Sequence, residues 1–322
     1  AAVCGGLLAT LFGLGHLSMP VLVGAVLLVT ALLLIMGQYR ALDQFIKLLS
    51  VVLLVTVLVA FAAVLLKGPS YKGAAVAGNS IWEGAGLTLL ISLLGWMPAG
   101  MEASVMNSVW NIEKVRSAGY RPSLAQTMFD FNLGYALTAL LAFAFLVIGA
   151  FTVYGSGQQL GGNSVQFTNQ LLQVFTESLG AWSYPVITIA AFGALYGTLI
   201  TVWDAYARCW SLSLTELRKQ GDTPPSDFQY ALYLLLIGIG GFLLFKFFSA
   251  SLLQILEAAT ITAFITAPVI GYLNLKAILS PAVAPADRPG KGELLLARIG
   301  LIFMAGFSIY YLYDLLIVPR FS

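Results

Sequence analysis

Apolar stretches long enough to cross a lipid bilayer follow one another along almost the whole of this chain. Of its 322 residues, 59% are hydrophobic and only 9% are charged, whereas ordinary soluble domains carry about 25% charged residues. The bilayer core holds no water, so every backbone N–H and C=O group inside it needs a partner within the protein, which only helices and closed barrels provide. Because the stretches have the length of helices, we expect an all-α, polytopic membrane protein.

Polar or glycine-rich connectors divide the chain into roughly nine such apolar segments. The segments are residues 3–14, 21–36, 48–66, 84–112, 123–153, 184–203, 228–248, 252–279 and 294–318. The first segment is short and the chain starts with Ala1, so we expect a truncated first span. Residues 165–180 have the spacing of an amphipathic helix that lies at the membrane interface.

The basic residues support this division. When alternate connectors are placed on the cytoplasmic side, all of the 16 Lys and Arg residues except Lys67, Lys72, Lys246 and Arg320 fall on that side. Membrane proteins concentrate Lys and Arg in cytoplasmic connectors. The bias therefore favours the predicted number and parity of the spans.

The segment 84–112 is interrupted in its middle by Pro98 and Gly100. Proline has no N–H and its ring collides with the carbonyl four residues earlier, so the carbonyl oxygen of Leu94 is freed. Secondary transporters bind ions and substrates at such breaks. Met97 stands beside this break, and a hard oxygen together with a thioether sulfur suits a transition-metal ion better than sodium or calcium. The alternative is a structural kink in which Met97 fills a packing gap.

Acidic residues inside the apolar segments have more than one interpretation. Glu102 follows the break, where its carboxylate could cap the start of the second half-helix or line a cation pathway. Asp204 lies near the cytoplasmic end of its segment, and we expect it to be solvated or paired with Arg208. Asp314 is expected to reach the interface at the outer end of the last segment.

Three motifs resemble the natural-resistance-associated macrophage protein (Nramp) family of divalent metal transporters, in a divergent bacterial branch. They are Trp-Met-Pro at residues 96–98, Gly-Gln-Tyr-Arg-Ala-Leu-Asp at residues 37–43 and Phe-Asp-Phe-Asn-Leu-Gly-Tyr at residues 129–135. The resemblance implies a multi-pass protein of the bacterial cytoplasmic membrane. It also implies the LeuT-type fold of two inverted five-helix repeats, here lacking its first two helices.

On this resemblance the chain has three parts. Residues 1–81 would form the helices equivalent to the third to fifth of the fold. Residues 82–280 would form the second repeat, whose first helix is broken at residues 97–100, and residues 281–322 would add a C-terminal helix.

The resemblance further implies a metal site. The family's sixth helix supplies a methionine sulfur and the carbonyl three residues earlier, which correspond to Met97 and Leu94, while its first-helix ligands are absent from this chain. Ala99 and Ser104 stand where the family has histidines associated with proton movement. The candidates for the ion pathway or for coupling are Ala99, Gly100, Glu102, Ser104, Thr201, Glu257, Thr260 and Thr262.

The expected function is secondary active transport of a divalent metal ion, Mn²⁺ or Fe²⁺, as substrate. The expected partners are this ion and the lipid bilayer, with no cofactor and no nucleic acid, and the sequence leaves the oligomeric state open. One alternative is a symporter for a small organic solute whose carboxylate binds the backbone N–H groups of Gly100 and Met101. Another is a non-transporting membrane scaffold. We do not expect an enzyme, because intramembrane zinc proteolysis needs a His-Glu-x-x-His cluster and the chain has 1 His.

Overall fold

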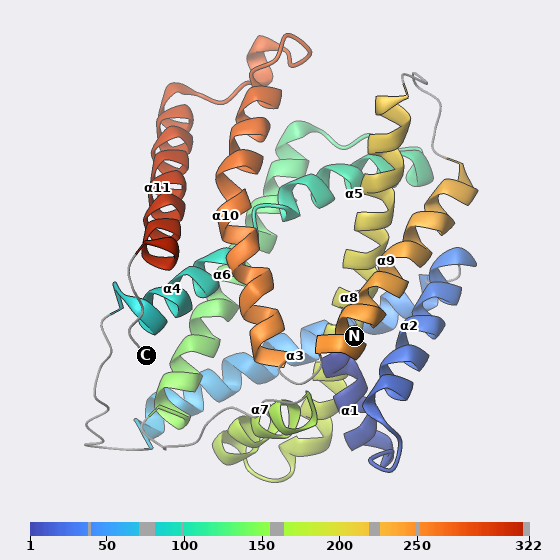
Figure 1. The fold of residues 1–322 in the computed structure, drawn as a ribbon, viewed down its shortest axis with the longest axis vertical. Coiled ribbons are helices and arrows are strands. Elements are labelled where there is room, and N and C mark those ends of the chain that lie inside the picture. Colours follow the sequence, from blue (N-terminus) through green and yellow to red (C-terminus); the bar gives the residue numbers. More distant parts are fainter. Residues whose placement is uncertain are drawn as a thin grey trace. The chain divides into compact units, whose positions relative to one another are not determined.

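The computed structural model describes residues 1–37, 40–70, 81–97, 99–154, 164–218, 226–248 and 252–317. All regular elements in these ranges are helices (Figure 1). Six of them are long and apolar enough to cross a membrane. This confirms the all-helical class and indicates a multi-pass membrane protein, while the LeuT-type arrangement stays a prediction.

Each predicted apolar segment corresponds to a helix or to a pair of helices. The single helices are α1 (Ala2–Phe12), α2 (Met19–Ile35), α3 (Arg40–Lys67), α6 (Leu124–Thr152), α8 (Ser183–Leu217), α9 (Asp227–Phe248), α10 (Leu252–Ile278) and α11 (Lys291–Leu316). The segment 84–112 forms two helices, α4 (Gly84–Trp96) and α5 (Ala103–Ala118). The predicted amphipathic segment forms α7 (Ser164–Leu179), and a short 3₁₀ turn, η1 (Pro285–Asp287), precedes α11.

Helix α8 is longer than the sequence predicts. It continues to Leu217, whereas the apolar segment ends at residue 203. The residues from 204 to 217 are more polar but include neither glycine nor proline, so nothing local ends the helix. The polar side chains of this stretch therefore belong to a helix and not to a connector.

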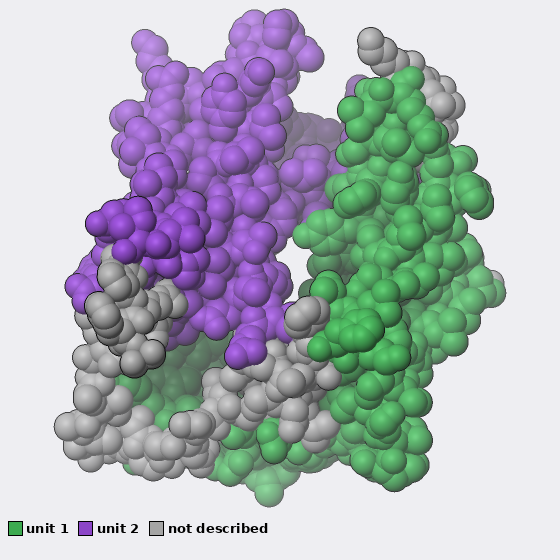
Figure 2. Space-filling model, in the orientation of Figure 1, with its two compact units in different colours: residues 1–75, 143–253 green, residues 76–142, 254–322 purple. Residues whose placement is uncertain are grey.

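The chain divides into two compact units, each made of segments that are distant in sequence (Figure 2). Unit 1 comprises Ala1–Ala75 and Phe143–Leu253, and unit 2 comprises Val76–Ala142 and Gln254–Ser322. Unit 1 thus contains helices from both predicted repeats.

The core of unit 1 forms around α8. In the most apolar stretch of α8, 50% of the residues are buried, whereas in that of the neighbouring α9 only 6% are. Helix α8 is more buried because it packs against α1, α2, α3, α7 and α9. The indole N–H of Trp203 donates to the carbonyl of Leu234 on α9 at 2.8 Å. The Trp203 ring lies against Gly238, where a Cβ would overlap it. Close packing and a hydrogen bond together join α8 to α9.

The core of unit 2 brings α4, α10 and α11 together. Leu87 and Ile91 of α4 pack with Phe264 of α10 and Tyr311 of α11. Pro268 lies inside α10 and cannot donate to the carbonyl of Phe264 four residues earlier. That carbonyl instead accepts a long hydrogen bond, 3.5 Å, from the hydroxyl of Ser308 on α11.

Asp314 is buried, which its place near the outer end of the last segment does not suggest. Only 6% of the residue is exposed, so its side chain packs inside the protein. Ser308, Tyr311 and Asp314 are the buried residues of α11, and their spacing of three places them on one face of the helix. Asp314 is buried because this face packs into unit 2.

Candidate functional site

The predicted interruption of segment 84–112 is confirmed. Helix α4 ends at Trp96 and α5 begins at Ala103 (Figure 1). Met97 has an extended backbone, with φ −107° and ψ 128°. A residue before proline is forced into this conformation because the proline ring clashes with its helical one. Pro98 itself lies outside the described residues, yet the Met-Pro pair accounts for the end of α4.

The carbonyl oxygen of Leu94 lacks a helical hydrogen-bond donor, as the sequence predicts. The last backbone hydrogen bond of α4 runs from the N–H of Met97 to the carbonyl of Leu93 at 3.0 Å. The next acceptor is Leu94, whose helical donor would be residue 98, a proline without N–H. No hydrogen bond between described residues reaches this oxygen. The Leu94 side chain packs against the core of unit 2, which holds its backbone in place.

Glu102 occupies the N-cap position of α5, but the capping hydrogen bond expected of its carboxylate is absent. The N–H of Ala103 donates instead to the carbonyl of Gly100 at 3.0 Å, and that of Ser104 to the carbonyl of Met101 at 3.2 Å. A Cβ at Gly100 would overlap both carboxylate oxygens of Glu102. Gly100 therefore allows a carboxylate to approach the unwound backbone.

Helix α10 contacts both half-helices. On the side of α4, a Cβ at Gly95 would overlap the carbonyl oxygen of Thr260, so the two backbones touch. On the side of α5, the Asn274 amide donates to the Ser104 hydroxyl at 2.7 Å, and this hydroxyl donates to the Met101 carbonyl at 2.6 Å. Asn274 was not among the predicted residues, although an amide inside an apolar helix is a signal that could have identified it.

No hydrogen bond between described residues joins the side chains of the remaining candidates to the break. The hydroxyls of Thr260 and Thr262 on α10 donate to carbonyls of their own helix, as Ser and Thr side chains often do. Thr201 belongs to unit 1, where its hydroxyl donates to the carbonyl of Gly197 at 2.9 Å. Glu257 is exposed on α10.

The side chains around the break do not form a conventional metal cluster. Ala99 is partly buried, and its methyl group offers no ligand atom. In the described part of the chain, no group of three or more His, Cys, Asp or Glu side chains could hold a metal ion. The donor atoms at the break are therefore backbone oxygens, the Met97 thioether, the Glu102 carboxylate and the Ser104 hydroxyl.

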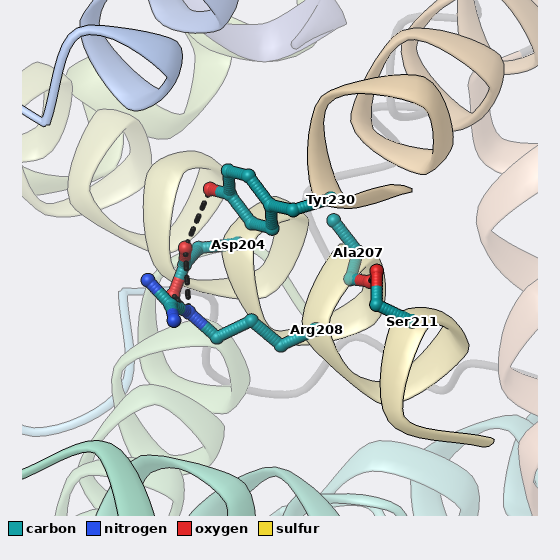
Figure 3. Close-up of polar contacts among 5 residues, drawn as sticks. All are labelled: Asp204, Ala207, Arg208, Ser211 and Tyr230. Atoms are coloured by element: carbon teal, nitrogen blue, oxygen red, sulfur yellow. Dashed lines mark hydrogen bonds and ion pairs between the residues drawn. The ribbon is translucent and has the colours of Figure 1, made fainter. Parts of the chain in front are cut away.

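A second polar cluster lies in unit 1 (Figure 3). The Nε of Arg208 donates to both carboxylate oxygens of Asp204, at 3.0 and 2.9 Å. The Tyr230 hydroxyl of α9 donates to Asp204 Oδ1 at 2.7 Å, and the Arg208 guanidinium lies over the Tyr230 ring, 5.1 Å from its centroid.

This cluster agrees only in part with the expectation from the sequence. The pairing of Asp204 with Arg208 is confirmed, but Asp204 is buried and not solvated. Tyr230 was not predicted, because it comes from another helix. One turn further along α8, the Ser211 hydroxyl donates to the Ala207 carbonyl at 2.8 Å. With a cation and a hydroxyl on one carboxylate, the cluster is suited to holding α8 and α9 together.

Comparison with known proteins finds a relative of this chain. The chain is 32% identical over 297 residues to the uncharacterized protein PM0681 of Pasteurella multocida (strain Pm70). The match covers 91% of this chain and 66% of that protein, so the chain spans slightly less than two thirds of the relative's length. No family model and no solved structure matches the chain.

Proposed function

We propose that this protein transports a divalent transition-metal ion, Mn²⁺ or Fe²⁺, across a membrane by secondary active transport. The ion binds at the interruption between α4 and α5. The observation that carries the proposal is that no donor among the described residues reaches the Leu94 carbonyl oxygen. Met97, whose side chain is partly buried, follows three residues later. A freed oxygen in an apolar helix requires a partner, and a cation can serve as one.

The choice of metal follows from the mixture of donor atoms. Calcium and magnesium take oxygen ligands almost exclusively. A thioether is a soft donor that favours transition metals, whereas carbonyl and carboxylate oxygens suit harder ions such as Mn²⁺. Leu94 and Met97 together fit an ion of intermediate character. The resemblance to the Nramp family favours the same two residues.

Glu102 favours a cation over an organic anion. The competing symporter hypothesis places a solute carboxylate on the N–H groups of Gly100 and Met101. The Glu102 carboxylate already lies at Gly100, and a second carboxylate there would be repelled, because like charges at such distances disfavour each other. The same negative charge attracts a divalent cation.

The test removes the sulfur and leaves the backbone oxygen. Met97→Ala is compared with the matched control Met128→Ala, in which an exposed methionine of α6 is truncated. Calorimetry on the purified protein in detergent measures the Kd for Mn²⁺ and for Ca²⁺. We expect Met97→Ala to raise the Kd for Mn²⁺ about tenfold, the effect of losing about 1.4 kcal/mol of binding free energy. Its affinity for Ca²⁺ should change much less.

The control variant should bind Mn²⁺ as the wild-type protein does. Thermal unfolding of each variant shows that it is folded. If folded Met97→Ala binds Mn²⁺ with the wild-type Kd, the proposed site is wrong. Uptake of Mn²⁺ into proteoliposomes then separates a transporter from a scaffold that only binds the ion.

A further inference from the structure

Helix α10 holds the interruption from both of its ends. Gly95, at the end of α4, lies against the Thr260 carbonyl, and Ser104, at the start of α5, accepts a hydrogen bond from Asn274. The two contact positions on α10 are roughly four helical turns apart. The unwound residues between α4 and α5 therefore have a contact with α10 at each of their two ends.

The contact at Asn274 extends into the unwound segment itself. The Asn274 amide donates to the Ser104 oxygen at 2.7 Å, and the single hydroxyl proton of Ser104 goes to the Met101 carbonyl at 2.6 Å. A hydroxyl can donate once and still accept, so the two bonds are compatible. Bonds in such a chain polarise one another and strengthen. This series of hydrogen bonds ends at the backbone carbonyl of Met101, between Gly100 and Glu102.

An amide in an apolar helix needs such a partner. An unbonded amide in an apolar surrounding costs free energy, and polar side chains in membrane helices commonly hydrogen-bond across to a neighbouring helix. Asn274 and Ser104 are 170 residues apart in the chain, so their bond joins two elements that sequence proximity does not hold together.

We propose that Asn274 is a positioning residue for the transported ion. Through Ser104 it holds the Met101 carbonyl and the first turn of α5, so that the unwound segment keeps the shape in which it binds the ion. This inference rests on the proposed function, because it assigns an effect on ion affinity to a residue outside the predicted ligand set. At the other end of the segment, Gly95 contacts α10 only by close approach of the two backbones.

The experiment breaks the bond from either side. Asn274→Ala and Ser104→Ala each remove it, Ser104→Thr keeps the hydroxyl, and Asn132→Ala is the matched control, an exposed asparagine of α6. Calorimetry measures the Kd for Mn²⁺. We expect each alanine variant to raise the Kd about fivefold, the factor that corresponds to one net hydrogen bond. The double variant should bind no more weakly than the weaker single variant, because both remove the same bond.

Asn132→Ala should bind Mn²⁺ as the wild-type protein does, and Ser104→Thr, which keeps the hydroxyl, should bind Mn²⁺ more tightly than Ser104→Ala. Hydrogen exchange, measured without metal, should become faster in Asn274→Ala at the first turn of α5. If both alanine variants keep the wild-type Kd while their thermal stability falls, the bond is merely structural and the proposal is overturned. If Asn274→Ala does not fold, the smaller change Ser104→Ala decides.

The two proposals fail in different ways. Wild-type protein without saturable Mn²⁺ binding overturns the proposed function and the role of Asn274 in ion affinity together. Mn²⁺ binding that Met97→Ala weakens and Asn274→Ala does not overturns the positioning role alone. The exchange measurement reports whether Asn274 holds α5 in either case.

Discussion

Each of the two units contains a carboxylate within or next to an apolar helix, and the two carboxylates differ in their hydrogen-bond partners. In unit 1, Asp204 is buried and receives hydrogen bonds from Arg208 and Tyr230. In unit 2, neither a hydrogen bond nor an ion pair between described residues reaches the Glu102 carboxylate, which lies beside unwound backbone. Groups that are satisfied internally contribute to the fold, whereas groups left open can bind something from outside. The difference separates a structural ion pair from a candidate binding site.

The largest expected loss of stability comes from removing Asp204, the carboxylate that both Arg208 and Tyr230 contact. Asp204→Ala leaves the partly buried guanidinium of Arg208 without this carboxylate, which should lower the free energy of unfolding by about 3 kcal/mol. Denaturation in detergent measures this loss. Because the cluster is structural, the Mn²⁺ affinity of the folded fraction should stay unchanged.

A double variant sharpens this prediction. Replacing a buried pair with apolar residues of similar volume is often neutral, so Asp204→Leu with Arg208→Met should recover most of the lost stability. A double variant that is stable but transports no ion would show instead that the pair takes part in transport, and the contrast between the units would fail.

A smaller effect is expected at the break. Gly95→Ala places a Cβ against the backbone of Thr260, which cannot move aside as a flexible side chain can. We expect a loss of about 2 kcal/mol in unfolding free energy, together with weaker Mn²⁺ binding, because the end of α4 shifts. Thermal unfolding and calorimetry measure the two effects.

The matched control is Gly306→Ala on α11, where a Cβ would meet nothing within 4 Å. It should be neutral or slightly stabilising, since alanine favours helix over glycine. Equal behaviour of the two glycine variants would contradict the close approach of α4 and α10.

The smallest effect concerns a single hydroxyl. Tyr230→Phe removes the 2.7 Å hydrogen bond to Asp204 and keeps the ring under the Arg208 guanidinium. We expect a loss of about 1.5 kcal/mol, the typical contribution of a hydrogen bond to a charged group, measured by denaturation. Tyr272→Phe on the exposed side of α10 is the control and should not change stability. A Tyr230→Phe variant as stable as wild type would mean that Arg208 alone satisfies Asp204.

Much of the architecture could be predicted because its causes are local. The length of the apolar segments predicts the helices of a multi-pass protein, since water-free surroundings force backbone hydrogen bonds into helices. The Met97-Pro98 pair predicts the end of α4, because the clash of a proline ring with the preceding residue needs no other part of the chain. The freed carbonyl of Leu94 follows from the same steric fact.

Other features depended on which helix faces meet. Asp314 is buried and the Glu102 carboxylate makes no capping hydrogen bond to α5, although both positions in the sequence suggested otherwise. Tyr230 reaches Asp204, and Asn274 reaches Ser104, from helices far away in the chain. The sequence by itself determined where helices form and where one breaks, because those are properties of neighbouring residues. Only the tertiary structure decided which polar groups are satisfied and which stay open, because hydrogen bonds between helices depend on packing that no local pattern encodes.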